Sequence, residues 1–198
     1  MGERGKGGMK EYLLDTNAFF EILSFLVGKN VRRDEYDFNE IKEGRCYISK
    51  ITEVEIISVI GKYARGEQEE WQRCDRIIAE DGTRCDKQYF HKGRKGWNKR
   101  LCKDMLKLVK EILDGSSTIL KVEVLDLNEE VVHYAKEFIM YAFKHKFGSQ
   151  DAFIAATAIA YSTEERSLQV VTSDKGLCAA MKKKGIPFVV PGNRINLE

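Results

Sequence analysis

The most informative segment of this 198-residue sequence is Ser149-Gln150-Asp151-Ala152-Phe153-Ile154-Ala155-Ala156-Thr157-Ala158. It places one acidic residue at the start of a run of small and apolar residues. Gly148 ends the preceding segment and Ser149 can cap a new helix, so Asp151 falls in the first helical turn. The helix dipole favours a carboxylate there, but burial beside the apolar run removes its water. The pattern therefore predicts hydrogen-bond donors or a cation next to Asp151.

Three other acidic residues occupy comparable positions in the chain. Asp15 follows the short apolar run 12–14, and Asp174 follows the run 168–172. Glu55 lies in the early turns of a predicted helix that Ser49 can cap, whereas Thr16 or Asn17 can cap the helix after the first run. We therefore expect the fold to bring four carboxylates together: Asp15, Glu55, Asp151 and Asp174.

Short apolar runs alternate along the chain with segments of helical period. The runs with strand character are 12–14, 46–48, 119–127, 168–172 and 186–190. The clearest helical period lies at 131–143, where the apolar residues recur at the spacing of one helix face. This alternation predicts an α/β fold with a mostly parallel sheet flanked by helices. In such folds, sites gather at the carboxyl ends of the strands.

Length and composition narrow the class of protein. We expect one domain over 10–198 after a flexible tail at 1–9, with an insertion at about 67–113 that we expect to be helical. Hydrophobic residues make up 43% of the chain, which argues against disorder, and a net charge of +2 predicts no particular partner. No apolar run approaches the roughly 20 residues needed to span a bilayer. Five cysteines without a secretory signal suggest the reducing cytoplasm.

The predicted carboxylate cluster favours a hard cation, Mg²⁺ or Mn²⁺, because no His or Cys accompanies it. Crowded like charges repel, and a bound cation relieves that repulsion. One or two such ions could activate water and stabilise charge on a phosphate, so this chemistry suits hydrolysis of a phosphodiester. The alternative for each acid taken alone is a helix cap or a turn residue, at roughly even odds.

Four motifs carry these acids. They are Leu13-Leu14-Asp15-Thr16-Asn17, Ser49-Lys50-Ile51-Thr52-Glu53-Val54-Glu55-Ile56, Asp151-Ala152-Phe153-Ile154-Ala155-Ala156-Thr157-Ala158 and Val171-Thr172-Ser173-Asp174. Their order and context resemble the PIN-domain family of metal-dependent ribonucleases, which includes the VapC-type toxins. The third motif is the most specific, and in the second the spacing from Thr52 to Glu55 selects Glu55 rather than Glu53. The resemblance covers about 10–65 and 118–190.

The resemblance implies a parallel sheet between helices, a Mg²⁺ or Mn²⁺ site and endonuclease action on RNA. It implies that four acids serve as metal ligands or water-positioning groups: Asp15, Glu55, Asp151 and Asp174. Three neighbours could hydrogen-bond these carboxylates: Thr16, Asn17 and Thr172. A toxin that pairs with an antitoxin and an RNA-processing enzyme are both open roles, and we expect a homodimer.

The segment 67–113 is longer than a compact family member needs, and it has its own charge pattern. From Gly82 to Lys110 there are ten Lys or Arg residues and two Asp residues. Four rings are interleaved with them: Tyr89, Phe90, His91 and Trp97. Basic residues can neutralise phosphates and aromatic rings can stack on unpaired bases, so we predict RNA contacts from Arg94, Lys95, Lys99 and Arg100. A solvated helical face or a protein-contact arm explains the pattern equally well.

The cysteines of this segment raise the question of a zinc site. Cys74, Cys85 and Cys102 lie near His91 in sequence, but no Cys-x-x-Cys pair is present. Simple thiols are therefore the better interpretation.

The leading hypothesis is a Mg²⁺- or Mn²⁺-dependent endoribonuclease. Its main rival is a non-catalytic module that binds RNA or a protein partner on the same scaffold, and metal-dependent cleavage separates the two. A phosphoacceptor at Asp15 ranks last, because Asp15-Thr16-Asn17 lacks a second Asp two residues further on.

Overall fold

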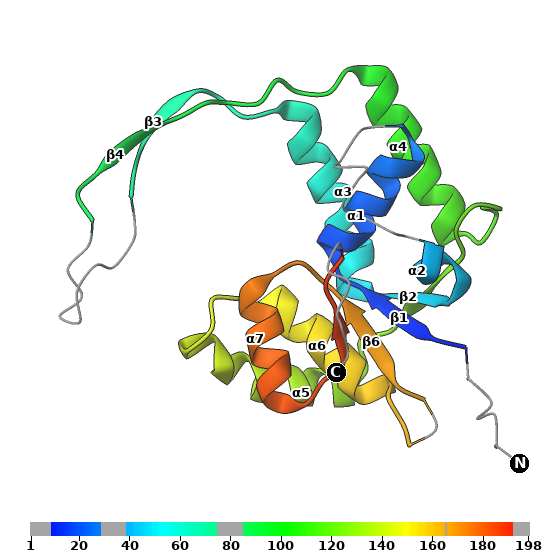
Figure 1. The fold of residues 1–198 in the computed structure, drawn as a ribbon. Helices are drawn as coiled ribbons and strands as arrows, with labels where there is room; N and C mark the ends of the chain where they lie inside the picture. The colour runs from blue at the N-terminus through cyan, green and yellow to red at the C-terminus, as the bar shows by residue number, and fades with distance from the viewer. Residues whose placement is uncertain (1–8, 29–38, 75–84, 165, 192–198) are drawn as a thin grey trace, which may run out of the picture.

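A five-stranded parallel sheet forms the centre of the protein (Figure 1). The computed structural model describes residues 9–28, 39–74, 85–164 and 166–191, so the predicted tail lies outside the described residues except for Met9. In spatial order the strands are β5 (Val122–Leu125), β2 (Arg45–Ser49), β1 (Glu11–Leu14), β6 (Leu168–Val171) and β7 (Phe188–Val189). Every neighbouring pair is parallel, as the alternation of apolar runs predicts.

Helices cover both faces of the sheet (Figure 1). One layer contains α1 (Thr16–Leu26), α2 (Asn39–Glu43), α3 (Lys50–Arg65) and α4 (Lys99–Leu113). The other contains α5 (Glu129–Phe138), the 3-10 helix η1 (Ile139–Phe143), α6 (Ser149–Tyr161) and α7 (Lys175–Lys184). Within the described residues, no helix is both long and apolar enough to cross a bilayer.

The three central strands, β2, β1 and β6, are buried on both faces, and alternate residues contact alternate layers. Leu14 and Ile48 pack with the core around α1, α3 and α4, whereas Leu13 and Tyr47 pack with the core around α6 and α7. This two-sided burial explains why the strands read in sequence as short continuous apolar runs rather than as alternating patterns.

The order of the strands reverses beside β1. The chain runs outward from β1 to β2 and β5, then returns to place β6 on the other side of β1. Leu14 is aligned with both Ile48 and Val171, so the carboxyl ends of the three strands stand level. Such a reversal leaves a crevice at the carboxyl edge of a parallel sheet, where ligands bind in α/β proteins.

The prediction of a helical insertion over 67–113 is wrong in its first part. β3 (Glu70–Arg73) and β4 (Gln88–His91) pair antiparallel and form an arm that extends away from the body of the protein (Figure 1). Trp71 and Phe90 face one another across the two strands, with ring centroids 5.5 Å apart. Aromatic cross-strand pairs of this kind favour a hairpin over a helix.

The second part of the segment is helical, but it is no appendage. Helix α4 buries Met105, Val109 and Ile112 in the same core as α1 and α3. The true insertion is therefore the stretch from Gly66 to Trp97, between two helices of the core.

Gly66 closes the base of the arm. It ends α3 with φ 76° and ψ −167°, a conformation that side chains strongly disfavour. A Cβ atom added there would lie 2.4 Å from the carbonyl oxygen of Arg94. The backbone N–H of Glu67 donates to that same carbonyl at 2.8 Å, which holds the two ends of the insertion together.

We predict that Gly66→Ala lowers the free energy of unfolding by about 1–3 kcal/mol, because the left-handed backbone and the Arg94 carbonyl both resist a side chain. Chemical denaturation measures it. The matched control is Gly61→Ala inside α3, where an added Cβ meets only the end of the Arg65 side chain at 3.3 Å. That change should leave stability equal or raise it by up to about 1 kcal/mol. Equal loss in both variants would contradict this account of Gly66.

Candidate metal centre

Asp15 occupies the central position at the carboxyl edge of the sheet. Its backbone N–H donates to the Val171 carbonyl at 3.1 Å, which continues the β1–β6 ladder by one residue. Its carboxylate accepts the N–H of Ala18 at 2.6 Å, so Asp15 itself caps α1. The prediction of Thr16 or Asn17 as the cap is therefore wrong: the residue that ends the strand also starts the helix.

The Asp15 carboxyl group is almost completely buried, with 2% of the residue exposed. Burial raises its pKa from the ordinary 3.8 to about 7. Hydrogen bonds from the Ala18 N–H and from the Thr172 hydroxyl oppose this rise, and the nearby charges of Asp151 and Glu21 add to it. Near neutral pH, an ionised Asp15 is thus costly unless positive charge is close by.

Glu55, and not Glu53, faces Asp15's helix. The Thr16 hydroxyl donates to the Glu55 carboxylate at 2.5 Å, which ties α3 to the first residue of α1. Glu53 instead forms an ion pair with Lys50 at 2.5 Å on its own helix. Ser49 caps α3 by accepting the N–H of Thr52 at 3.3 Å, which fixes the register that separates the two glutamates.

Asp151 lies in the first turn of α6, as its sequence context predicts. Its carboxylate accepts the backbone N–H of Gly148 at 2.8 Å, and Gly148 rather than Ser149 is the capping position. Burial raises the pKa of Asp151, the Gly148 N–H lowers it, and the negative charges of Asp174 and Glu55 raise it further. Asp151 is therefore within electrostatic reach of two acids on other elements.

Asp174 follows β6 and caps α7 by accepting the N–H of Leu177 at 2.7 Å. Its own backbone N–H donates to the Thr172 hydroxyl oxygen at 3.0 Å, and that hydroxyl is also bonded to Asp15. Gly176 packs directly on the loop before α6, where an added Cβ would lie 1.9 Å from the Lys146 carbonyl oxygen. This close approach brings the start of α7 against the start of α6.

Helix capping, the alternative interpretation, describes three of the four acids. Asp15, Asp151 and Asp174 each accept a backbone N–H at the start of a helix, so each performs the local task that the alternative interpretation gave it. Capping explains the position of each of these residues separately, but it does not require the three residues to lie near one another. The charge of Asp151 raises the pKa of Asp15, and the charges of Asp174 and Glu55 raise the pKa of Asp151. The fold therefore brings four carboxylates from four elements into one neighbourhood, although not to within ligand distance of a single ion.

The donor set fits a hard divalent cation in its chemistry. Within the described part of the chain, neither Lys nor Arg forms an ion pair with any of the four acids. As the side chains stand, however, no three acidic, His or Cys side chains among the described residues are close enough to hold one ion. Like-charge repulsion favours this separation, so ion binding would require the carboxylates to rotate inward.

Two of the three predicted hydrogen-bonding neighbours contact the acids. Thr16 and Thr172 are buried and contact Glu55 and Asp15, respectively. Asn17 is exposed, and none of its described contacts is with the acids.

Two residues near the acids escaped the sequence prediction. Glu21 on α1 is close enough to raise the pKa of Asp15, and its signal was an acidic residue inside the apolar run of that helix. Cys178 on α7 is half-buried rather than a core thiol, and its Sγ lies 3.9 Å from the Thr172 carbonyl oxygen. Burial and the charges of Asp174 and Asp15 raise the pKa of this thiol to about 11, so it stays protonated.

The four basic residues predicted to contact RNA do not form one group. Arg94 lies 3.7 Å above the Tyr63 ring and pairs with Glu67 at 3.2 Å, so it is committed to the base of the arm. Lys95, Lys99 and Arg100 are exposed at the start of α4 and its approach. These contacts make Arg94 the least available of the four, and all four stay predictions.

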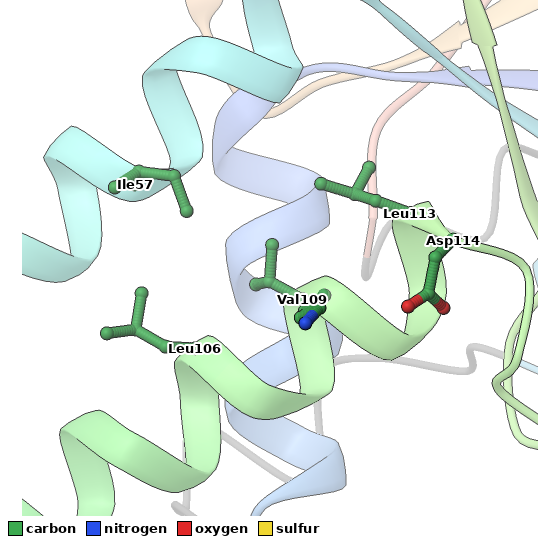
Figure 2. Close-up of a pocket in the computed structure, with 6 residues that line it drawn as sticks. Ile57, Leu106, Val109, Leu113 and Asp114 are labelled. Atoms are coloured by element: carbon green, nitrogen blue, oxygen red, sulfur yellow. The ribbon is translucent and has the colours of Figure 1, made fainter.

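A separate hollow of about 310 Å³ lies between α3 and α4. Figure 2 shows Ile57 from α3 facing Leu106, Val109 and Leu113 from α4, with Asp114 at one end. Its lining is mostly apolar, and none of the four acids contributes to it. This groove between α3 and α4 therefore differs in place and in lining from the carboxylate cluster.

The comparisons with known proteins bear on the fold. No protein-family model matches the sequence, and no curated protein is similar to it in sequence. Among solved structures, FitAcB from Neisseria gonorrhoeae shares 20% identity over 91% of this chain and 97% of that one, with a TM-score of 0.53. VapBC2 from Rickettsia felis, bound to a DNA fragment from their promoter, shares 19% identity over 89% of this chain and 92% of that one, with a TM-score of 0.45. The FitAcB likeness confirms the predicted fold class, a parallel sheet flanked by helices.

The raised pKa of Asp15 predicts that, in the absence of divalent cations, the free energy of unfolding falls as pH rises. The unfolded chain loses this proton near pH 4 and the folded protein near pH 7, so folding becomes less favourable as pH rises between them. Asp15→Asn removes the penalty and keeps an oxygen for the Ala18 N–H. In EDTA the variant should be more stable than the wild type at pH 8, by on the order of 4 kcal/mol at most. The gain should shrink at pH 5, and denaturation at the two pH values measures it. A variant less stable than the wild type at pH 8 would refute the assignment.

Proposed function

We propose that this protein is a Mg²⁺- or Mn²⁺-dependent endoribonuclease of the PIN type. The observation that carries the proposal is the convergence of Asp15, Glu55, Asp151 and Asp174 at the carboxyl edge of the sheet, without a Lys or Arg partner in the described residues. Such a site is unfavourable without positive charge and suits a divalent cation. RNA as the substrate follows from the resemblance of the four motifs.

Each residue of the site would have a distinct role in binding the ion or in positioning a ligand. Asp15 and Asp174 are held at the edge of the sheet by their helix caps, and their carboxylates would turn inward to bind an ion. Thr172 holds these two positions together through one hydroxyl group, and Thr16 orients Glu55. The bound ion would supply an activated water and stabilise charge on the phosphate.

The cellular role that we propose is a toxin held in check by a protein antitoxin, or an RNA-processing nuclease. Support for the toxin role is the resemblance of the motifs to VapC-type toxins, together with the fold shared with FitAcB. Growth arrest on expression, relieved by a co-expressed partner and lost in Asp15→Asn, would favour the toxin. A cytoplasmic site of action stays a prediction.

The rival function is a non-catalytic module that binds RNA or protein. Two observations favour it: the carboxylates are not gathered at ligand distance, and an exposed arm and an apolar groove offer binding surfaces. Metal-dependent cleavage decides between the two functions.

We predict that the protein cleaves unstructured RNA with Mn²⁺ and that EDTA abolishes cleavage. Asp15→Asn and Asp151→Asn should each reduce the cleavage rate at least about 100-fold, because the ion needs anionic oxygen. Circular dichroism should show an intact fold in both variants. Full activity in either variant would remove the carboxylates from the reaction.

The two glutamates of α3 offer a matched pair. Glu55→Gln should weaken Mn²⁺ binding in calorimetric titration and slow cleavage, because Glu55 faces the other acids. Glu53→Gln should change neither by more than about twofold, because its partner is the exposed Lys50. The opposite ranking would show that the second motif has been placed in the wrong register.

We also propose a homodimer formed through the groove between α3 and α4. Lys110 and Asp114 line one part of an otherwise apolar surface, so a two-fold contact can set each against the other across the interface. Ile57 and Leu106 are 47% and 42% exposed there, and a second copy would cover both.

Leu106→Glu should therefore convert the dimer to a monomer, because it places a carboxylate in the apolar interface. Light scattering coupled to gel filtration measures the mass in solution. The control is Ile119→Glu, at a similarly exposed apolar residue that does not line the groove. A wild-type monomer, or a dimer that survives Leu106→Glu, would contradict the proposal.

A further inference from the structure

The two faces of the arm differ in chemistry. The β3–β4 register places Trp71, Arg73, Gln88 and Phe90 on one face. Lys92 follows β4 at the next position of the same alternation, and we call this surface, with Lys92, the stacking face. The other face carries Gln72, Tyr89 and His91.

The polar groups of the second face are satisfied within the arm. The Tyr89 hydroxyl donates to the Gln72 side chain at 3.0 Å, and the Gln72 amide donates to Glu70 at 2.8 Å. His91 lies 3.5 Å from a carboxylate oxygen of Glu67. This face therefore has local partners for its polar side chains.

The stacking face leaves its groups available. Trp71 is 69% exposed and Phe90 is 50% exposed, although the two rings contact each other edge to face. Arg73 and Lys92 are exposed on either side of the rings, and neither forms an ion pair with any residue that the structure describes. By the same alternation Glu69 and Asp86 also lie on that face, one at each end, so acids and cations are equal in number there.

An isolated two-stranded sheet has no second layer to cover such rings, and large exposed aromatics on a soluble domain mark a binding surface. Exposed aromatic rings flanked by cations that have no ion partner among the described residues match the chemistry of single-stranded nucleic acid. Bases stack on the rings while the cations meet phosphates. A duplex offers no free base faces, and an apolar protein surface would leave both cations without partners.

We propose that the stacking face binds unpaired RNA and holds it at a distance from the carboxylate cluster. This inference rests on the proposed function only in naming RNA as the ligand. It moves the RNA contact of the insertion away from Arg94, which is committed to Glu67 and Tyr63, and onto Trp71 and Phe90. The arm would then set substrate affinity without taking part in hydrolysis.

The test is titration of tryptophan fluorescence with a short unstructured RNA and with a duplex of the same sequence, in EDTA so that no cleavage occurs. The single strand should quench emission and the duplex should not. In Trp71→Phe the remaining Trp97 packs against Phe20 and Tyr63, so the signal should no longer respond.

The decisive pair of variants is Phe90→Ala and Tyr89→Ala. The two residues are adjacent and equally exposed, at 50%, but they lie on opposite faces. Phe90→Ala should weaken binding of the single strand roughly 5- to 150-fold, the range for loss of one stacked base. Tyr89→Ala should leave the affinity within about twofold. Replacing Arg73 and Lys92 together by Ala should lower the log–log salt slope by about 1.4.

Three outcomes would overturn the proposal. The first is an unchanged affinity of Phe90→Ala for the single strand. The second is an equal loss of affinity in Phe90→Ala and Tyr89→Ala. The third is a mass in solution that differs between Phe90→Ala and the wild type, which would identify the face as a protein contact. The failure of the proposed function looks different. Tight single-strand binding without metal-dependent cleavage would support the stacking face and refute the nuclease, whereas cleavage with the same KM in Phe90→Ala would do the reverse.

Discussion

The hydrogen bonding of β1 to a strand on each side is the constraint on which the site depends. It sets the ends of β1, β2 and β6 level, and the N–H of Asp15 extends the ladder to Val171 by one more residue. A carboxylate placed by two neighbouring strands has little freedom to leave a buried position. The sheet therefore holds the carboxylate of Asp15, the most buried of the four acids, in place, and the elements that carry the other three acids lie near it.

The helix caps explain how such a site can be tolerated. A carboxylate that accepts a backbone N–H at a helix start recovers part of the solvation that burial removes, and the helix dipole adds to this. Asp15, Asp151 and Asp174 all have this compensation, so the same hydrogen bonds that begin three helices also support the charges. Glu55, which lies further inside its helix, has a threonine hydroxyl in place of a cap.

The residues of the candidate site could be predicted from the sequence where they also form short-range patterns, such as strand ends and helix starts. Asp15, Asp151 and Asp174 could be found because each stands at a boundary between a strand or loop and a helix, and such boundaries have short-range signals. Glu55 lies inside its helix and was found from its spacing after Thr52. The caps were assigned one residue too late at Thr16 and Ser149, because capping preference alone does not say which of two neighbouring polar residues turns the chain. The arm could not be predicted, because the pairing of Trp71 with Phe90 joins residues far apart in sequence. The role of Arg94 likewise depends on Tyr63 and Glu67, which only folding brings to it.

The closed base of the arm has an evolutionary consequence. The chain leaves α3 and returns to α4 at a clamp formed by Gly66 and Arg94. This clamp holds the two ends of the insertion together, regardless of which residues lie between them. Lengthening or replacing a loop whose ends already meet adds little closure entropy, since that entropy grows only with the logarithm of length. The region beyond the clamp can therefore diverge without disturbing the sheet. Selection can in this way act separately on the sheet and on the region beyond the clamp.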